Sequence, residues 1–150
     1  MKKTLILVLA LLSLNVVFSQ NTFTIGNLTY QEISKENPGL KVISGSVSGD
    51  TLIIPSNLTH DGRDYTVTTI GVSAFSYLNG IKVVVLPPTI TTIEGWAFAQ
   101  CENLESINLP DSLAYIGNSA FECCHSLPFI SIPYRVTYIG DAAFKHCESL

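Results

Sequence analysis

The chain has 150 residues, of which 47% are hydrophobic and 13% charged, a composition that excludes an intrinsically disordered protein. Twelve acidic residues outweigh eight basic ones, so the net charge is −4. Nucleic acids and anionic membranes attract basic surfaces, and this balance therefore argues against both as partners.

Residues 1–19 have the layout of a secretory signal peptide. Two lysines precede the apolar stretch Leu5–Leu14, and Val17 and Ser19 suit the −3 and −1 positions of a cleavage site. The apolar run is shorter than the roughly 20 residues that a membrane span needs. We expect an exported protein, secreted or at the cell surface, with no membrane insertion after cleavage. Cleavage removes two lysines and no acid, which leaves six basic and twelve acidic residues.

The next segment, residues 20–51, has no internal period. It contains strand-like runs at Leu40–Ile43 and Thr51–Ile54, separated by turn residues. A repeat array needs a terminal unit that covers its open apolar end. We therefore expect residues 20–51 to form an N-terminal β cap.

From residue 52 onward the sequence repeats every 23 residues. Phenylalanine, isoleucine, alanine, proline and cysteine each recur in register, the clearest columns being Phe75, Phe98, Phe121 and Phe144; Ile70, Ile93, Ile116 and Ile139; and Cys101, Cys124 and Cys147. A period of 23 lies within the range of leucine-rich repeats, in which each unit is one strand and a return segment. Residues 52–150 are therefore expected to form a repeat array.

A single coil can be interpreted residue by residue. Leu104–Leu109 alternates apolar and polar side chains like a strand, and Pro110 ends it. Leu113 and Ile116 return to the core, and Ser119–Phe121 is expected to make one helical turn. The predicted fold is a leucine-rich-repeat solenoid, mostly β, with a short helical turn in each 23-residue coil.

The two ends of the array differ from its middle. Pro55 and Pro87 are 32 residues apart, which is one period plus nine. The insert lies at residues 58–67 around Asp61-Gly62, a strong two-residue hairpin signal, so a β-hairpin is expected there. The last coil is incomplete at Leu150, which predicts an uncapped C-terminal end and a fragment of a longer array.

Two coils carry a family resemblance. Residues 109–124, LPDSLAYIGNSAFECC, and 132–147, IPYRVTYIGDAAFKHC, resemble the BspA-type leucine-rich repeat. The resemblance covers about residues 52–150. It implies a bacterial or mucosal surface protein associated with adhesion to host matrix proteins, cells or other microbes, and it implies no catalysis.

One group of side chains has metal-binding chemistry, namely Cys123, Cys124, His125, His146 and Cys147. Zinc accepts such ligands. However, Cys124 and Cys147 share the inward column of Cys101, where cysteine behaves as a small buried hydrophobe. Parallel side chains on neighbouring coils rarely reach the dihedral angle of a disulfide. We expect buried thiols, no metal and no cofactor, with a disulfide between adjacent coils as the alternative.

No catalytic residues are predicted. The three histidines have no acid or nucleophile at motif spacing, and Ser119 does not lie in a G-x-S-x-G turn. The chain is therefore expected not to be an enzyme.

The strand positions that face solvent are the candidate binding residues, namely Val83, Val85, Asn108 and Phe129. Apolar side chains at exposed positions are typical of a contact surface, although pairing between coils is the alternative. Thr92, Tyr115 and Tyr138 form a second exposed column, suited to recognition or to packing. We expect adhesion to an extracellular protein or glycan. The alternative is a structural spacer, or a truncated fragment with no binding activity of its own.

Overall fold

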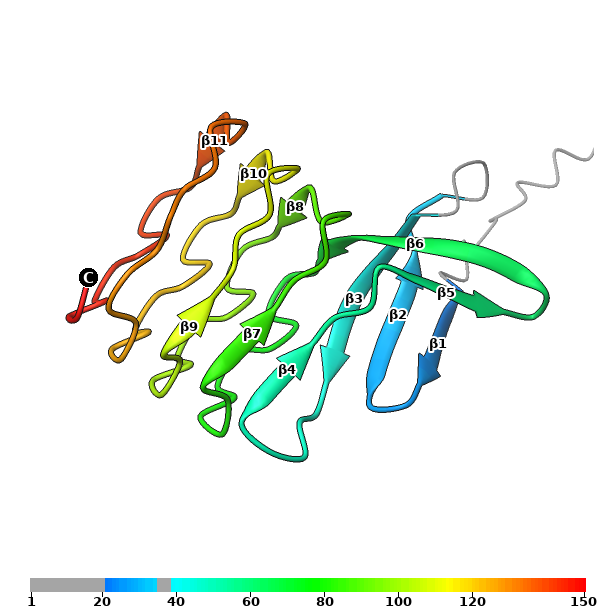
Figure 1. Ribbon diagram of the computed structural model, residues 1–150, viewed down its shortest axis with the longest axis horizontal. Coiled ribbons are helices and arrows are strands. Elements are labelled where there is room, and N and C mark those ends of the chain that lie inside the picture. The colour runs from blue at the N-terminus through cyan, green and yellow to red at the C-terminus, as the bar shows by residue number, and fades with distance from the viewer. Residues whose placement is uncertain (1–20, 35–38) are drawn as a thin grey trace, which may run out of the picture.

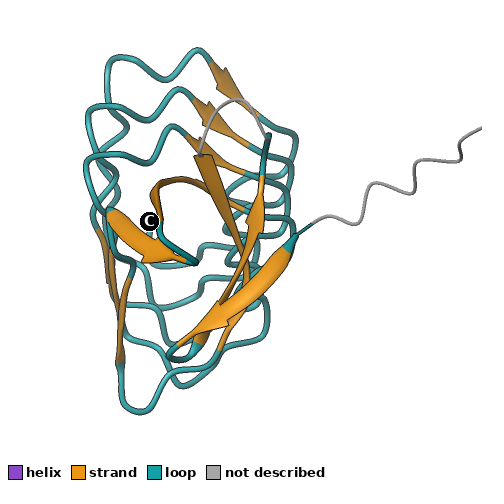
Figure 2. Cartoon of the chain, turned by 90° about the vertical axis from the view of Figure 1, so that its right-hand side faces the viewer, coloured by secondary structure: helices purple, strands orange, loops and turns teal. Residues whose placement is uncertain are grey.

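The computed structural model describes residues 21–34 and 39–150, so the expected signal peptide at 1–19 lies outside the described residues. The described chain is built of short strands and turns, with no helix in either range (Figure 2). Successive coils lie side by side along the long axis, as Figure 1 shows. The architecture is the predicted open leucine-rich-repeat solenoid.

Two sheets run along the solenoid. The long sheet has the order β1-β2-β3-β6-β8-β10-β11, with β5 paired to β6. Its strands are β1 (Thr22–Ile25), β2 (Leu28–Glu32), β3 (Gly39–Gly45), β5 (Asn57–His60), β6 (Arg63–Ile70), β8 (Thr92–Ile93), β10 (Tyr115–Ile116) and β11 (Tyr138–Ile139). The short sheet contains β4 (Thr51–Ile53), β7 (Val83–Val85) and β9 (Ser106–Ile107), which are parallel.

The core lies between the two sheets and is made of the columns that the period defines. Ile93, Ile116 and Leu113 are fully buried. The phenylalanine rings stack along the axis, with centroids 5.5 Å apart for Phe75–Phe98 and Phe98–Phe121 and 5.3 Å apart for Phe121–Phe144. Each coil therefore buries its apolar face mainly against its neighbours, as expected for a solenoid.

The helical turn expected at Ser119–Phe121 is not confirmed, and the segment forms linked turns instead. The amides of Ser119, Phe121 and Cys123 donate to carbonyls of the next coil, those of Asp141, Ala143 and Lys145. An α-helix would direct each amide to the carbonyl four residues earlier in its own segment. Ser119 and Cys123 also have positive φ, which a right-handed helix does not allow. The alternate amides, those of Ala120, Glu122 and Cys124, bond to the carbonyl three residues earlier in their own segment, as in turns.

Three of the four equivalent corners of the long sheet carry glycine. Gly117 lies so close to the preceding coil that a Cβ would stand 2.4 Å from the backbone nitrogen of Gly95. Gly71 and Gly140 hold the same position in their coils and also face backbone atoms of the preceding segment. Glycine therefore allows a close approach between coils at these three corners, whereas Glu94 holds the same position in the remaining coil.

The N-terminal strands continue the long sheet and lie across its end (Figure 2). β3 runs parallel to β6, with Leu40 opposite Val67, and β2 and β1 follow antiparallel. Leu28, Tyr30 and Leu40 are buried in the same hydrophobic core as the coils. These strands therefore share one core with the array.

β5 and β6 form a hairpin whose loop is Asp61-Gly62. Both loop residues have positive φ, 50° and 71°, as a type I′ turn requires. β6 extends to Ile70, beyond the end of the expected insert, and enters the main sheet, pairing with β3 along one edge and with β8 at Thr69 and Ile70. The ring of Phe23 stacks on His60 with centroids 3.9 Å apart, which ties β1 to the hairpin.

The opposite end of the array is less covered. Ile139 is half-exposed, whereas Ile93 and Ile116 in the same column are fully buried. Phe144 and Cys147 are likewise only partly buried. The burial of each column therefore depends on a neighbouring coil on both sides.

Candidate binding surface

The outward positions of the short sheet form two columns. Strand pairing places Thr51 beside Val83 and Val83 beside Ser106, and it places Ile53 beside Val85. The 23-residue period adds Phe129 to the first column and Asn108 to the second. We call this face, with Ile53, Val83, Val85, Asn108 and Phe129, the short-sheet face.

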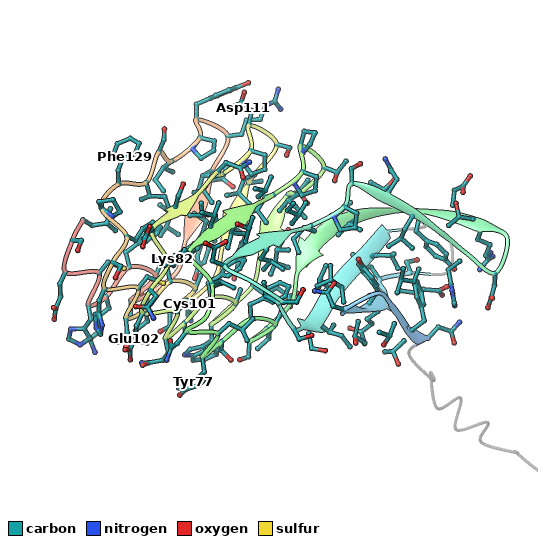
Figure 3. All side chains as sticks on the ribbon, turned by 60° about the horizontal axis from the view of Figure 1, so that its bottom comes forward. Tyr77, Lys82, Cys101, Glu102, Asp111 and Phe129 are labelled. Carbon is teal, nitrogen blue, oxygen red and sulfur yellow. The ribbon has the colours of Figure 1, made fainter. Side chains whose placement is uncertain are left out.

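Apolar side chains on the short-sheet face are exposed to very different degrees. Phe129 is 72% exposed, Ile53 65% and Val85 42%. Val83 is half-buried between its neighbours. Figure 3 shows Phe129 on the outside of the coils, away from Tyr77. Exposed apolar residues on a rigid scaffold are typical of a contact surface.

Asn108 has a structural partner on this face. Its amide nitrogen donates to the Leu86 carbonyl at 2.9 Å, and its amide oxygen accepts the Leu86 N–H at 2.8 Å. The side chain thereby replaces a strand hydrogen bond between two coils. Its polar atoms are consequently engaged, and the apolar residues are the stronger contact candidates.

Charge on the short-sheet face is paired between coils. The Lys82 ammonium lies 2.8 Å from the Glu105 carboxylate, and both side chains are about half-exposed. The hydrogen bond to Glu105 raises the pKa of Lys82. The Lys82–Glu105 pair is neutral as a whole, and the Asp50 carboxylate also acts on Lys82.

Ile53 is the surface residue that sequence analysis missed. The nine-residue insert separates the first coil from the regular period, so the columns do not extend to it by simple counting. The alignment of Ile54-Pro55 with Leu86-Pro87 contains the signal, because it places Ile53 opposite Val85.

The cysteine column lies inside the corner turns, and all four cysteines are free thiols. Each inward thiol donates to the carbonyl of a phenylalanine in the preceding coil: Cys101 to Phe75, Cys124 to Phe98 and Cys147 to Phe121, at 3.1–3.3 Å. The thiol is thus a second donor to a carbonyl that already accepts the N–H three residues further on, as Phe75 does from Leu78. This bond explains why a small donor recurs every 23 residues.

The thiols differ in acidity because their surroundings differ. Burial raises the pKa of Cys101 to about 12. When Cys147 loses its proton, the Cys124 S–H can turn from the Phe98 carbonyl and donate to the Cys147 thiolate. This bond lowers the pKa of Cys147 and raises that of Cys124, which is also buried. Cys147 is therefore the more acidic thiol of the pair.

We expect iodoacetamide to alkylate Cys147 at lower pH than Cys101, because the thiolate is the reacting form. The Cys124→Ala variant removes the stabilising donor and should move the pH midpoint for Cys147 upward. Cys124→Ser keeps a donor and should leave the midpoint near its original value. Mass spectrometry of alkylated peptides measures both, and equal midpoints in the two variants would rule out the hydrogen bond as the cause.

Within residues 21–34 and 39–150, no three histidine, cysteine or acidic residues converge as a metal site would require. The same ranges contain no helix that is long and apolar enough to cross a membrane.

The stacked parallel coils, the buried phenylalanine column and the 23-residue period define a leucine-rich-repeat solenoid. Residues 56–150 match the BspA type leucine rich repeat region in six copies, and the chain belongs to this family. No curated protein matches the chain.

Three solved structures show the same fold. A leucine-rich repeat protein from Bacteroides capillosus is 28% identical, with a TM-score of 0.72 over 81% of this chain and 93% of the other. A leucine-rich repeat protein from Bacteroides ovatus is 31% identical, with a TM-score of 0.66 over 85% and 39%. A leucine rich cell surface protein from Faecalibacterium prausnitzii is 24% identical, with a TM-score of 0.71 over 86% and 41%. The chain thus spans about two fifths of the length of the last two.

Proposed function

We propose that the chain is an exported, non-enzymatic module that binds an extracellular protein through the short-sheet face. The observation that carries this proposal is the exposure of Ile53 and Val85 on the parallel sheet and of Phe129 on the next coil. Export rests on the signal-peptide layout of residues 1–19 and is supported by a structural neighbour described as a cell surface protein.

The size of the face sets the mode of binding. Three strands of two or three residues and one further coil, spaced by about 4.8 Å and rising about 3.3 Å per residue, offer only about 200 Å². A standard interface buries about 800 Å² on each partner. A single copy should therefore bind weakly, and many copies on one surface would bind through avidity.

The test is a pull-down from extracellular-matrix extract with residues 20–150 immobilised at high density. We expect a retained protein that is lost when Val85 and Phe129 are replaced by serine. Tyr77→Asn is the matched control, because Tyr77 is also 72% exposed but lies elsewhere on the coils. The retained protein is then purified and its affinity measured for each variant. Equal affinity for all variants would exclude this face, and no retained protein would favour the spacer function.

A further inference from the structure

The outward face of the long sheet carries a separate aromatic column. Strand pairing places Thr92 beside Tyr115 and Tyr115 beside Tyr138. The two tyrosine rings are nearly parallel, 7° between planes, with centroids 4.8 Å apart. Both rings are partly exposed. They form a short stack that runs along the solenoid axis.

This ring stack stops at Thr92, where the side chain is too short to continue it. In the adjoining column Gly95 stands where the neighbouring coils have Val72 and Asn118. Two small residues in one coil leave a hollow of about 470 Å³, lined by Val72, Thr92, Glu94, Gly95 and Tyr115. One wall is therefore a tyrosine ring, and the empty space is the next position in the stack.

A carboxylate is held in a fixed orientation in the hollow. One oxygen of Glu94 lies 2.5 Å from the Lys41 ammonium, and the other accepts the Val72 N–H at 3.0 Å. Lys41 compensates the charge of Glu94, so the hollow is not built to trap a cation. The carboxylate oxygens have further lone pairs that accept hydrogen bonds from a ligand.

The lining of the hollow indicates a flat, uncharged ligand that carries hydroxyl groups. A pyranose ring has one apolar C–H face that packs on an aromatic ring and a rim of hydroxyls that donate to a carboxylate. Pockets of this kind combine an apolar wall with a few placed polar groups. The acidic balance of the mature chain disfavours an anionic sugar. An unsubstituted aromatic side chain would stack but would offer no hydrogen-bond donor to the remaining lone pairs of Glu94.

We propose that this hollow binds a neutral hexose unit of a glycan. The sugar's C–H face packs on Tyr115 as the third member of the stack, and its hydroxyls bond Glu94 and Thr92. The site lies on the long sheet and is independent of the short-sheet face. The molecule thus has two binding surfaces of different chemistry.

The test follows the ring signals of Tyr115 by NMR in the chain labelled at tyrosine. The probes are maltotriose, cellotriose and mannotriose, with a heparin hexasaccharide and N-acetyltyrosinamide for comparison. We expect at least one neutral trisaccharide to shift the Tyr115 signals saturably below about 10 mM, an affinity range usual for single weak sites. In Tyr115→Ala, followed through the signals of the neighbouring Tyr138 ring, binding should weaken at least about tenfold.

Two variants separate loss of the site from loss of the fold. Thr92→Tyr fills the hollow with the protein's own ring and should abolish binding while circular dichroism stays unchanged. Phe129→Ser alters only the short-sheet face and should leave sugar binding intact. The proposal is overturned if no trisaccharide shifts Tyr115, if only heparin or N-acetyltyrosinamide does, or if Thr92→Tyr binds as before.

Discussion

Replacing Phe121 by alanine should lower the free energy of unfolding by about 3–5 kcal/mol, the usual cost of deleting a buried aromatic ring. The ring is fully buried and lies between Phe98 and Phe144, with centroids 5.5 and 5.3 Å away. Its removal would leave a cavity in the middle of the stack. Neighbouring coils cannot close this cavity, because the hydrogen bonds between coils fix their spacing.

Urea unfolding followed by circular dichroism measures this loss. Phe144→Ala is the internal comparison, because its ring is only partly buried and has one stacked neighbour, so it should cost less. A loss below about 1 kcal/mol for Phe121→Ala would contradict a core role for the phenylalanine column.

Gly117→Ala should cost at least about 2 kcal/mol, although it adds only a methyl group. The new Cβ would stand 2.4 Å from the backbone nitrogen of Gly95 and 2.6 Å from the carbonyl carbon of Glu94. Backbone atoms cannot rotate away as a side chain can. The coils would have to separate locally and weaken the hydrogen bonds between them.

Gly80→Ala provides the matched control for this substitution. A Cβ at Gly80 meets no atom within 4 Å, and its φ is outside the left-handed region. This change should be neutral or stabilise by about 0.4–1 kcal/mol, through reduced entropy of the unfolded chain. Similar losses for both variants in thermal unfolding would show that the spacing between coils is not set at Gly117.

Much of the fold was predictable because the period repeats the same packing in each coil. The inward columns of Ile116, Phe121 and Cys124 are buried as counting predicts. That linked turns would form in place of the expected helical turn was not predictable, because a helical turn and linked turns both place Ala120 and Phe121 inward. The choice between them depends on whether every second amide bonds to the next coil, and no local pattern carries that information.

The surface was less predictable than the core. Val85 and Phe129 are exposed as expected, but the pairing of Asn108 with the Leu86 backbone depends on side-chain geometry across two coils. The hollow beside Tyr115 arises because Thr92 and Gly95 are small in the same coil. Neither residue indicates a cavity until the stacking of neighbouring coils is known.

The bonding between coils also determines how the molecule yields to force. The hydrogen bonds between coils run along the solenoid axis. Tension between the two ends of the molecule therefore acts on these bonds one coil after another. Each released coil contributes 23 residues, or about 80 Å of extended chain. A copy anchored at one end and bound at the other would therefore lengthen in steps and act as an extensible tether under shear.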